Sequence, residues 1–186
     1  MTHLAGTTVA ILATDGFEQS ELFEPRQQLS NAGVNIVTVS LEAGEIKGWD
    51  QDNWGRAVPV DATIDSVSVD DFDALVLPGG QINPDVLRTD QAAVDFIKAF
   101  DDAGKPVAAI CHAPWLLAEA GIAKGRDLTS YHSIKTDMIN AGARWHDEMV
   151  VQDENLITSR NPGDLDAFCG RLIDVLASKK ADRSAA

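Results

Sequence analysis

Short apolar runs alternate with amphipathic segments along this chain of 186 residues. Such alternation is typical of strands joined by crossover helices, and it predicts an α/β fold with a parallel sheet. Turn residues support the pattern, because Pro78-Gly79-Gly80 stops one of the apolar runs. The predicted buried strands cover residues 8–13, 34–41, 74–77 and 106–110.

Helices are predicted between these strands from apolar spacing and from end signals. Residues 18–32 form an amphipathic segment that ends at Gly33. Pro25 lies inside it, so this helix either starts near the proline or bends there. Thr89 is a plausible N-cap for a helix that runs through Ala103. Further helices are predicted from Pro114 onward and over residues 133–140.

A final helix is predicted to open at Asn161 and Pro162, an N-cap residue followed by proline at the first helical position. The apolar face of this helix comprises Leu165, Phe168, Cys169, Leu172, Ile173 and Leu176. Because Cys169 lies on that face, we expect it to be a core residue.

The remaining segments complete one domain. Residues 44–60 are rich in glycine and suit a hairpin or a loop, and residues 149–151 and 156–158 predict a late hairpin. The polar tail over residues 179–186 is expected to be frayed. Since no linker interrupts the pattern, we expect a single domain over residues 1–186 with its core at about 7–178.

Composition and charge argue against several classes of protein. Hydrophobic residues make up 45% of the chain and charged residues 24%, as in ordinary globular proteins. The net charge of −14 argues against nucleic acid and anionic membranes as partners. No apolar run approaches the roughly 20 residues that span a bilayer, and the N-terminus does not resemble a signal peptide. Two distant cysteines form no disulfide framework, which predicts a cytoplasmic location.

The segment Ile110-Cys111-His112-Ala113-Pro114-Trp115 carries the strongest chemical signal. Here a predicted buried strand ends at a cysteine, and a helix begins at once. The N-terminus of a helix favours a thiolate, which is the nucleophilic form of cysteine, and the layout matches a strand-to-helix nucleophile elbow. The alternative is a packed cysteine at the end of a strand, since free cysteine is among the most buried residue types.

Loops that follow the parallel strands should meet at one edge of the sheet, where ligands of such folds bind. The first of these loops carries Glu18, the third carries Gly79, Gly80 and Asp85, and the fourth carries Cys111 and His112. This edge therefore predicts a site built from a thiol, a histidine, carboxyl groups and a glycine pair.

Each candidate has a possible task. A partly buried Glu18 would stay protonated and donate a hydrogen bond to the sulfur of Cys111; alternatively, it is a solvated glutamate at the start of a helix. Gly79 and Gly80 would let backbone N–H groups form half of an oxyanion hole, or would only serve a tight turn.

The N–H of His112 would complete the oxyanion hole, and its imidazole is the candidate general base. Neighbouring side chains usually diverge, so the pair requires the unusual backbone of an elbow. Asp85 is the candidate that orients His112, from the same chain or from another subunit. No metal-ligand spacing and no phosphate loop is present in the sequence, so neither a metal nor a cofactor is expected. His132 and His146 are expected to be surface or structural residues.

With these motifs in place, nearly the whole chain resembles the DJ-1/PfpI superfamily, within it the branch of intracellular proteases and general stress proteins. The resemblance rests on residues 15–22, 73–80, 104–112, 129–131, 135–137, 140–143 and 158–162. It implies a flavodoxin-like three-layer sandwich that works as a homodimer or a higher homo-oligomer. It also implies that Cys111 is the nucleophile, that Glu18 hydrogen-bonds to it, and that His112 is its neighbour.

In protease-like members of this superfamily, an acidic residue of the partner subunit completes a triad. Here the loop after the glycine pair is one residue longer, and Asp85 stands where a glutamate is usual. Activities in the superfamily include peptidase, cofactor-free glyoxalase, deglycation, chaperone activity and oxidative-stress sensing, and the fold does not choose among them.

Three hypotheses follow. The first is a stress-protective enzyme that acts on small aldehydes, dicarbonyls or their early adducts with amino acids and peptides. The second is an oxidative-stress sensor or chaperone in which Cys111 is reversibly oxidised. The third is a cysteine peptidase with a Cys111-His112-Asp85 triad.

Overall fold

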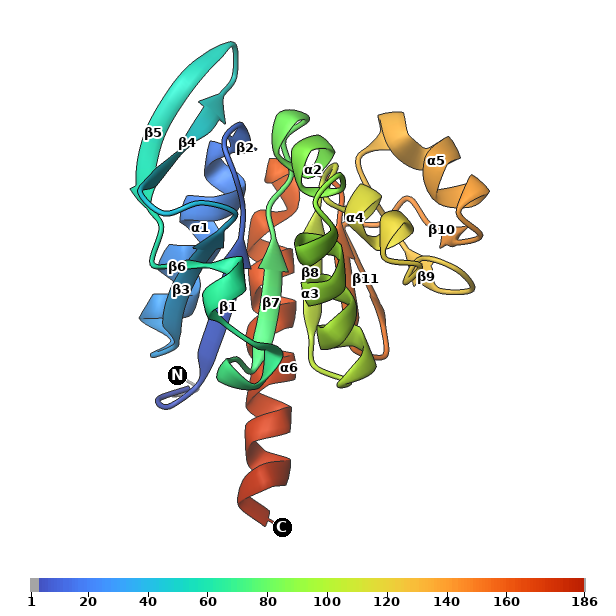
Figure 1. Ribbon diagram of the computed structural model, residues 1–186. Coiled ribbons are helices and arrows are strands. Elements are labelled where there is room, and N and C mark those ends of the chain that lie inside the picture. The colour runs from blue at the N-terminus through green and yellow to red at the C-terminus, as the bar shows by residue number, and fades with distance from the viewer. Residues whose placement is uncertain (1–3, 186) are drawn as a thin grey trace.

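A seven-stranded sheet forms the middle layer of the computed structural model, which describes residues 4–185 (Figure 1). The strands lie in the order β11-β12-β8-β7-β1-β3-β6. Their bounds are β1 (Thr8–Leu12), β3 (Asn35–Ser40), β6 (Ala62–Thr63), β7 (Ala74–Leu77), β8 (Val107–Ile110), β11 (Val150–Asp153) and β12 (Leu156–Ser159). Neighbouring strands pair in parallel except β11 and β12, which form the predicted late hairpin. The mostly parallel sheet and the flavodoxin-like sandwich are confirmed.

Helices cover both faces of the sheet. Their bounds are α1 (Gln19–Asn31), α2 (Ile82–Leu87), α3 (Gln91–Asp102), α4 (Pro114–Glu119), α5 (Lys135–Asn140) and α6 (Leu165–Ala185). Figure 1 shows α6 behind the sheet and α3 in front of it. No helix among the described residues combines the length and the apolar character that crossing a membrane requires.

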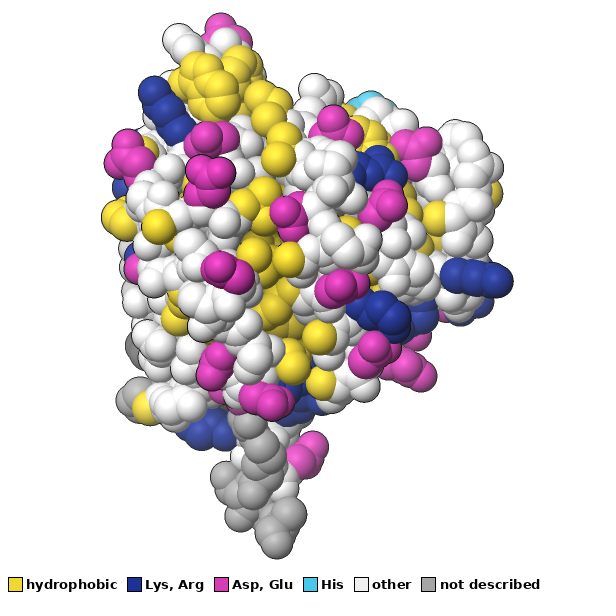
Figure 2. Space-filling model, in the orientation of Figure 1, with side chains coloured by type: hydrophobic (Ala, Val, Ile, Leu, Met, Phe, Trp, Pro, Cys, Tyr) yellow, Lys and Arg dark blue, Asp and Glu magenta, His cyan; other side chains and the backbone are white. Residues whose placement is uncertain are grey.

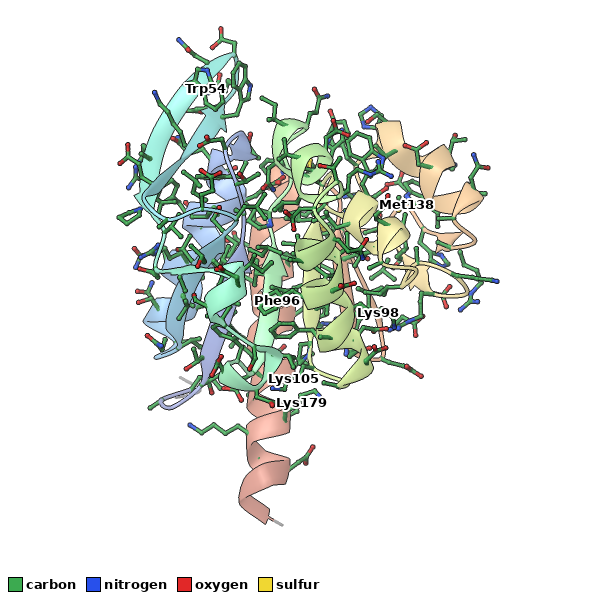
Figure 3. All side chains as sticks on the ribbon, viewed as in Figure 1. Trp54, Phe96, Lys98, Lys105, Met138 and Lys179 are labelled. Atoms are coloured by element: carbon green, nitrogen blue, oxygen red, sulfur yellow. The ribbon has the colours of Figure 1, made fainter. Side chains whose placement is uncertain are left out.

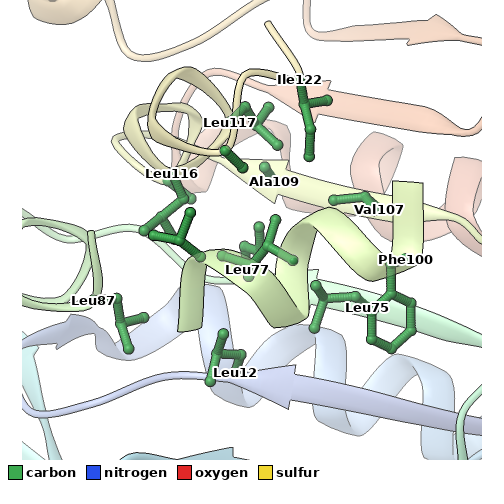
Figure 4. Packing of buried hydrophobic residues seen from close by; sticks show 14 of the residues in the cluster. Leu12, Leu75, Leu77, Leu87, Phe100, Val107, Ala109, Leu116, Leu117 and Ile122 are labelled. Carbon is green, nitrogen blue, oxygen red and sulfur yellow. The ribbon is translucent and has the colours of Figure 1, made fainter. Parts of the chain in front are cut away.

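Alternate side chains of the central strands divide the core between the two faces. On one face Leu75 and Leu77 of β7 pack with Phe100 of α3 and Leu116 of α4 (Figure 4). On the opposite face Val76 of the same strand belongs to a second cluster that contains residues of α1 and α6. Strands that are buried on both sides explain why these runs are apolar at every position rather than at alternate ones.

The strand order places a switch point between β1 and β7. The chain passes from β1 to β3 on one side and then returns to β7 on the other side of β1. In open α/β sheets, the crevice beyond the carboxyl ends of the strands at such a point is the usual ligand site. The loops that follow β1 and β7 meet here, as the sequence predicts.

The glycine-rich residues 44–60 form the expected hairpin. Its strands β4 (Glu45–Asp50) and β5 (Asn53–Pro59) pair antiparallel, and the short strand β2 (Phe17–Glu18) joins them in parallel. Trp54 lies at the outer part of this hairpin (Figure 3) and is 45% exposed. Figure 2 shows exposed hydrophobic side chains on the hairpin. Acidic side chains are scattered over the same face of the molecule.

The structure corrects one predicted helix end and excludes one of the two alternatives for another. Asp90 rather than Thr89 is the N-cap of α3, because its Oδ1 accepts the N–H of Ala93 over 3.0 Å. The Thr89 hydroxyl instead donates to the carbonyl of Val86 over 2.8 Å. Helix α1 begins at Gln19, well before Pro25, which is buried inside it.

The last helix differs at both ends from the prediction. Asn161 caps a 3-10 turn (η4, Pro162–Asp164) before α6 begins at Leu165. The tail that was expected to be frayed continues as helix as far as Ala185, and Ala186 lies outside the described residues. Cys169 is 1% exposed, so its predicted place in the core is confirmed.

Candidate active site

Cys111 lies on a strained elbow between β8 and α4. Its φ of 64° is in the left-handed region, which costs a residue with a side chain roughly 1–2 kcal/mol. Two hydrogen bonds hold this conformation: the Cys111 N–H donates to Ser159 O over 3.1 Å, and the Cys111 carbonyl accepts from Tyr131 N over 2.8 Å. The elbow that the sequence predicts is therefore present, and neighbouring segments on both sides fix it.

The carboxyl group beside the sulfur belongs to Glu21 and not to Glu18. Glu21 is fully buried on the inner face of α1, and its carboxyl interacts with the Cys111 thiol. Its Oε2 accepts the Gly79 N–H over 2.9 Å, and its Oε1 is buried without an oxygen or nitrogen partner among the described residues. Burial raises the pKa of Glu21 to about 8, with a smaller rise from the charge of Glu18. Glu21 therefore stays protonated at neutral pH and can donate its proton toward the sulfur.

Glu18 has the alternative role considered above, at the start of a helix. It is the N-cap of α1, and its Oε1 accepts from the Ser20 N–H over 3.3 Å and from the Ser20 hydroxyl over 2.7 Å. The N-cap position turns this side chain toward the first helical turn, whereas Glu21 lies three residues on and faces the core. The expected contact between Glu18 and Cys111 is thus wrong.

A helical signal in the sequence could have identified Glu21. The buried residues of α1 are Glu21, Leu22, Pro25 and Leu29, which share one helical face. A carboxyl group on the apolar face of a helix is costly unless it is protonated or paired. The position of Glu21 on the apolar face was therefore a stronger indication of function than the position of Glu18 in the loop after the first strand.

The environment of the sulfur affects its ionisation in opposite directions. Burial raises the pKa of the Cys111 thiol, and the carboxyl of Glu21 raises it further when ionised. The backbone N–H groups of Gly80 and His112 donate to the sulfur and lower this pKa. Burial therefore disfavours the thiolate that the sequence predicts for the resting state. Because the thiol is then protonated, a base close to it is needed to make it nucleophilic.

His112 is the base within reach. Its Nδ1 lies 3.2 Å from the Cys111 sulfur, so the elbow brings together two neighbouring side chains that would otherwise diverge. Its Nε2 lies 3.2 Å from the Ser133 hydroxyl, and the ring stacks on Tyr131 at 4.8 Å between centroids. Burial, assisted by nearby His132, lowers the pKa of His112. The imidazole is therefore neutral at pH 7 and can accept a proton.

The glycine pair is required by close packing. A Cβ at Gly79 would lie 2.7 Å from the Cβ of Cys111 and 2.8 Å from the Ile110 carbonyl. Gly80 has a φ of +81°, and a Cβ there would clash with the carbonyl oxygen of Gly16. The tight turn and the close approach of the Gly80 N–H to the sulfur are thus combined in one loop.

Asn83 holds this loop in place, and the sequence reading missed it. Its side chain is fully buried; Oδ1 accepts the Thr14 N–H over 2.8 Å. Its Nδ2 donates to the carbonyls of Pro78 and Gly79 over 2.8 and 3.2 Å. One amide therefore ties the loop after β1 to the loop after β7, although nothing in an Asn-Pro pair distinguishes this role from an ordinary turn.

Asp85 is exposed on α2 and does not line the cavity above Cys111. No carboxylate among the described residues of this one chain hydrogen-bonds to His112, whose Nε2 contact is Ser133. The same-chain triad with Asp85 is therefore not formed. A contribution from Asp85 of another subunit stays a prediction.

A cavity of about 410 Å³ opens above the sulfur. Cys111 and His112 form part of its lining, together with Trp49 and Gln51 of the hairpin segment, Glu18 and Tyr131. Such a volume admits a small carbonyl compound or the end of a modified side chain. Among the described residues, no cluster of three or more His, Cys, Asp or Glu side chains is arranged to hold a metal ion.

Known proteins share both the sequence and the fold. The model of the DJ-1/PfpI family matches residues 7–175. "Putative cysteine protease YraA" of Bacillus subtilis is 44% identical over 90% of this chain and 97% of its own length. "Deglycase TK1284" of Thermococcus kodakarensis is 44% identical over 90% and 98%. The crystal structure of Drosophila melanogaster DJ-1beta has a TM-score of 0.84 at 31% identity, over 94% of this chain and 92% of that one.

Proposed function

Because the chain belongs to the DJ-1/PfpI family, we propose that it is a cysteine-dependent enzyme that consumes reactive dicarbonyls and their early adducts with amines and thiols. The observation that carries this proposal is the 3.2 Å contact between the Cys111 sulfur and His112 Nδ1 at the base of the cavity. A neutral base beside a protonated thiol suits attack on an electrophilic aldehyde carbon. A relative is named a deglycase, which agrees with this substrate class.

The first step is addition of the thiol to the aldehyde carbon. The carbon–sulfur bond forms while His112 Nδ1 takes the thiol proton, and the carbonyl oxygen becomes an oxyanion. The N–H groups of Gly80 and His112, which point toward the sulfur, are placed to hold this oxygen. The proton then passes from His112 to the oxyanion and gives a hemithioacetal.

The following steps release an acid and restore the thiol. An enediol forms when a proton leaves the former aldehyde carbon and a proton adds to the neighbouring carbonyl oxygen. Protonation of the neighbouring carbon and loss of the proton from the other hydroxyl group then give the thioester of a hydroxy acid. Water then cleaves the carbon–sulfur bond. The sum is one dicarbonyl plus one water giving one hydroxy acid, so no external oxidant is needed.

Adducts enter the same sequence. In an early adduct with an amine, the carbon–nitrogen bond breaks as the carbon–sulfur bond forms, and the amine leaves with the thiol proton. The product on Cys111 is the same hemithioacetal. The protonated carboxyl of Glu21 supports this chemistry, because a neutral donor beside the sulfur does not repel the developing thiolate.

Methylglyoxal consumption tests the proposal. The wild type should convert methylglyoxal into lactate, as followed by proton NMR, while Cys111→Ala should lose this activity. Cys169→Ala is the matched control, since it removes the other free thiol, which is buried outside the cavity. If Cys111→Ala retains the activity, the proposal is wrong.

A second function is favoured by the donors around the sulfur. Gly80 N–H, His112 N–H and the protonated Glu21 carboxyl could hold the oxygens of a sulfinic acid, as a sensor of oxidative stress requires. Mild peroxide should then add two oxygens to Cys111 in an intact-mass measurement and leave Cys169 unmodified. Both functions suit a reducing compartment, and because both cysteines are free we propose a cytoplasmic location.

A further inference from the structure

Both ring nitrogens of His112 have a partner within one chain. Nδ1 lies 3.2 Å from the Cys111 sulfur, and Nε2 lies 3.2 Å from Ser133 Oγ. His112 is 5% exposed and its imidazole is stacked on Tyr131, so the orientation of the ring is restricted. The thiol of Cys111, the imidazole of His112 and the hydroxyl of Ser133 are therefore consecutive groups in one chain of polar contacts.

A neutral imidazole carries a single N–H, so its two nitrogens cannot both accept a proton. If Nδ1 is to take the Cys111 proton, the N–H must lie on Nε2 and needs an acceptor there. Ser133 Oγ occupies this position. A serine hydroxyl can accept from Nε2–H when the imidazole is neutral, and it can still accept when both ring nitrogens are protonated.

We propose that Ser133 is a positioning residue that selects the tautomer of His112 in which Nδ1 is free to deprotonate Cys111. This inference rests on the proposed function for its catalytic consequence, but the tautomer itself does not depend on any substrate. It assigns the orienting task to a hydroxyl group of the same chain, whereas the sequence predicts Asp85 for that task.

Hydrogen bonds hold the backbone turn that carries Ser133, an exposed residue, close to the elbow that carries the thiol. Ser133 is the middle residue of η3 (His132–Ile134), and Ile134 is 2% exposed in the core. The Ile134 N–H donates to the Tyr131 carbonyl over 3.2 Å, and the Tyr131 N–H donates to the Cys111 carbonyl over 2.8 Å. Two hydrogen bonds therefore connect the turn that carries Ser133 to the elbow that carries the nucleophile.

The groups around His112 leave the selection to Ser133. Cys111 lies on the elbow, Trp115 on α4 presents its ring at 5.2 Å between centroids, and Tyr131 stacks on the imidazole. His132 lowers the pKa of His112, and Arg88 of α2 lies beyond the Trp115 ring.

Two carboxyl groups also lie nearby. Glu18, from the loop after β1, lines the cavity, and Glu21 of α1 lies at the sulfur. None of these is a partner of Nε2 among the described hydrogen bonds, and Ser133 is.

Nitrogen-15 NMR of the imidazole measures the tautomer directly. In the wild type near neutral pH, Nε2 of His112 should carry the proton and Nδ1 should not, and in Ser133→Ala the two forms should be mixed. Ser133→Thr keeps a hydroxyl and should restore the wild-type spectrum. If Nδ1 carries the proton in the wild type, or if Ser133→Ala leaves the spectrum unchanged, the proposal is overturned.

Kinetics give the functional readout. Ser133→Ala should lower kcat for methylglyoxal about tenfold with little change in KM, since the base is misoriented while the cavity is intact. Ser133→Thr should recover most of this loss, because it restores the hydroxyl group. If Ser133 only shaped the turn, restoring the hydroxyl group would not be needed for recovery. Iodoacetamide alkylation of Cys111 near pH 7 should slow in Ser133→Ala by a similar factor. An unchanged alkylation rate and kcat in Ser133→Ala would contradict the proposal.

Failure of the proposed function is distinguishable from failure of this inference. A wild type that does not consume methylglyoxal would reject the proposed enzyme, while the NMR and alkylation results would still decide the role of Ser133. If Asp85→Asn rather than Ser133→Ala disturbs the tautomer, a carboxylate of another subunit holds Nε2 and the assignment to Ser133 is wrong.

Discussion

Glu21 accepts the backbone N–H of Gly79 over 2.9 Å, and this bond joins helix α1 to the loop after β7 directly beneath the nucleophile. The same carboxyl interacts with the Cys111 thiol, so the glycine loop and the sulfur share one buried acid. Because the acid is protonated at neutral pH, its ionisation should affect both the stability of the fold and the reactivity of the thiol.

The first prediction concerns stability. The pKa of Glu21 is raised from 4.5 to about 8, so the folded protein binds one more proton than the unfolded chain between these values. The free energy of unfolding should therefore fall as pH rises from about 4.5 to 8, by at most about 5 kcal/mol for this group. Glu21→Gln keeps an acceptor for Gly79 and removes the titration.

Urea unfolding at several pH values checks this. The stability of Glu21→Gln relative to the wild type should increase from pH 5 to pH 8. Glu24→Gln is the control, because it removes an exposed carboxyl of the same helix. A constant difference between Glu21→Gln and the wild type over this range would mean that Glu21 is not protonated in the fold.

The second prediction concerns the thiol. Above about pH 8 the ionised Glu21 raises the pKa of Cys111, and in Glu21→Gln this charge is absent. Iodoacetamide should therefore alkylate Cys111 faster in Glu21→Gln than in the wild type at pH 9, by about tenfold if the thiol pKa differs by one unit. At pH 6 the two rates should be similar. Equal rates at both pH values would show that the carboxyl does not control the sulfur.

The third prediction concerns the glycine loop. Gly79→Ala places a methyl group 2.7 Å from the Cβ of Cys111 and should cost about 1–3 kcal/mol of stability. It should also reduce the alkylation rate of Cys111, because the loop must move away from the sulfur. Gly170→Ala is the matched control, since nothing lies within 4 Å of a Cβ there and alanine favours the helix. Thermal unfolding of both variants measures this difference. If Gly79→Ala were as stable as Gly170→Ala, the predicted clash at Gly79 would be wrong.

The fourth prediction concerns Asp85. If the reacting groups come from one chain, Asp85→Asn should change methylglyoxal turnover by less than twofold, as expected for an exposed residue of α2. Peptide hydrolysis that disappears in Asp85→Asn but persists in the wild type would instead support a triad completed by another subunit. Casein and small peptide substrates provide this measurement.

The fold followed from the sequence because its strands are buried on both faces. The runs at residues 74–77 and 106–110 differ from β7 and β8 by at most one residue, since covered strands are apolar at every position. Thr89 and Asp90 show the limit: both are good N-cap residues, and only the three-dimensional contact of Thr89 with Val86 decides between them.

The sequence predicts those parts of the site that depend on the course of the backbone. A strand that runs directly into a helix fixes the elbow at Cys111, and glycine at residues 79 and 80 marks the close approach. Glu21 and Ser133 were missed for different reasons. Glu21 faces the core only because α1 begins at Gln19, and Ser133 meets His112 only because Tyr131 is tethered to the Cys111 carbonyl. The helical spacing places Glu21 on the apolar face of α1 but does not show that this face meets the sulfur, and no spacing along the chain brings Ser133 to His112.

The hairpin β4–β5 has a consequence for the range of substrates. It contributes Trp49 to the wall of the cavity, yet it is attached through the short strand β2 and belongs to a sheet separate from the one that carries the elbow. Substitutions in this excursion can therefore resize or recharge the entrance without disturbing the parts that hold the sulfur. Selectivity and reactivity are consequently open to separate adaptation, by evolution or in the laboratory.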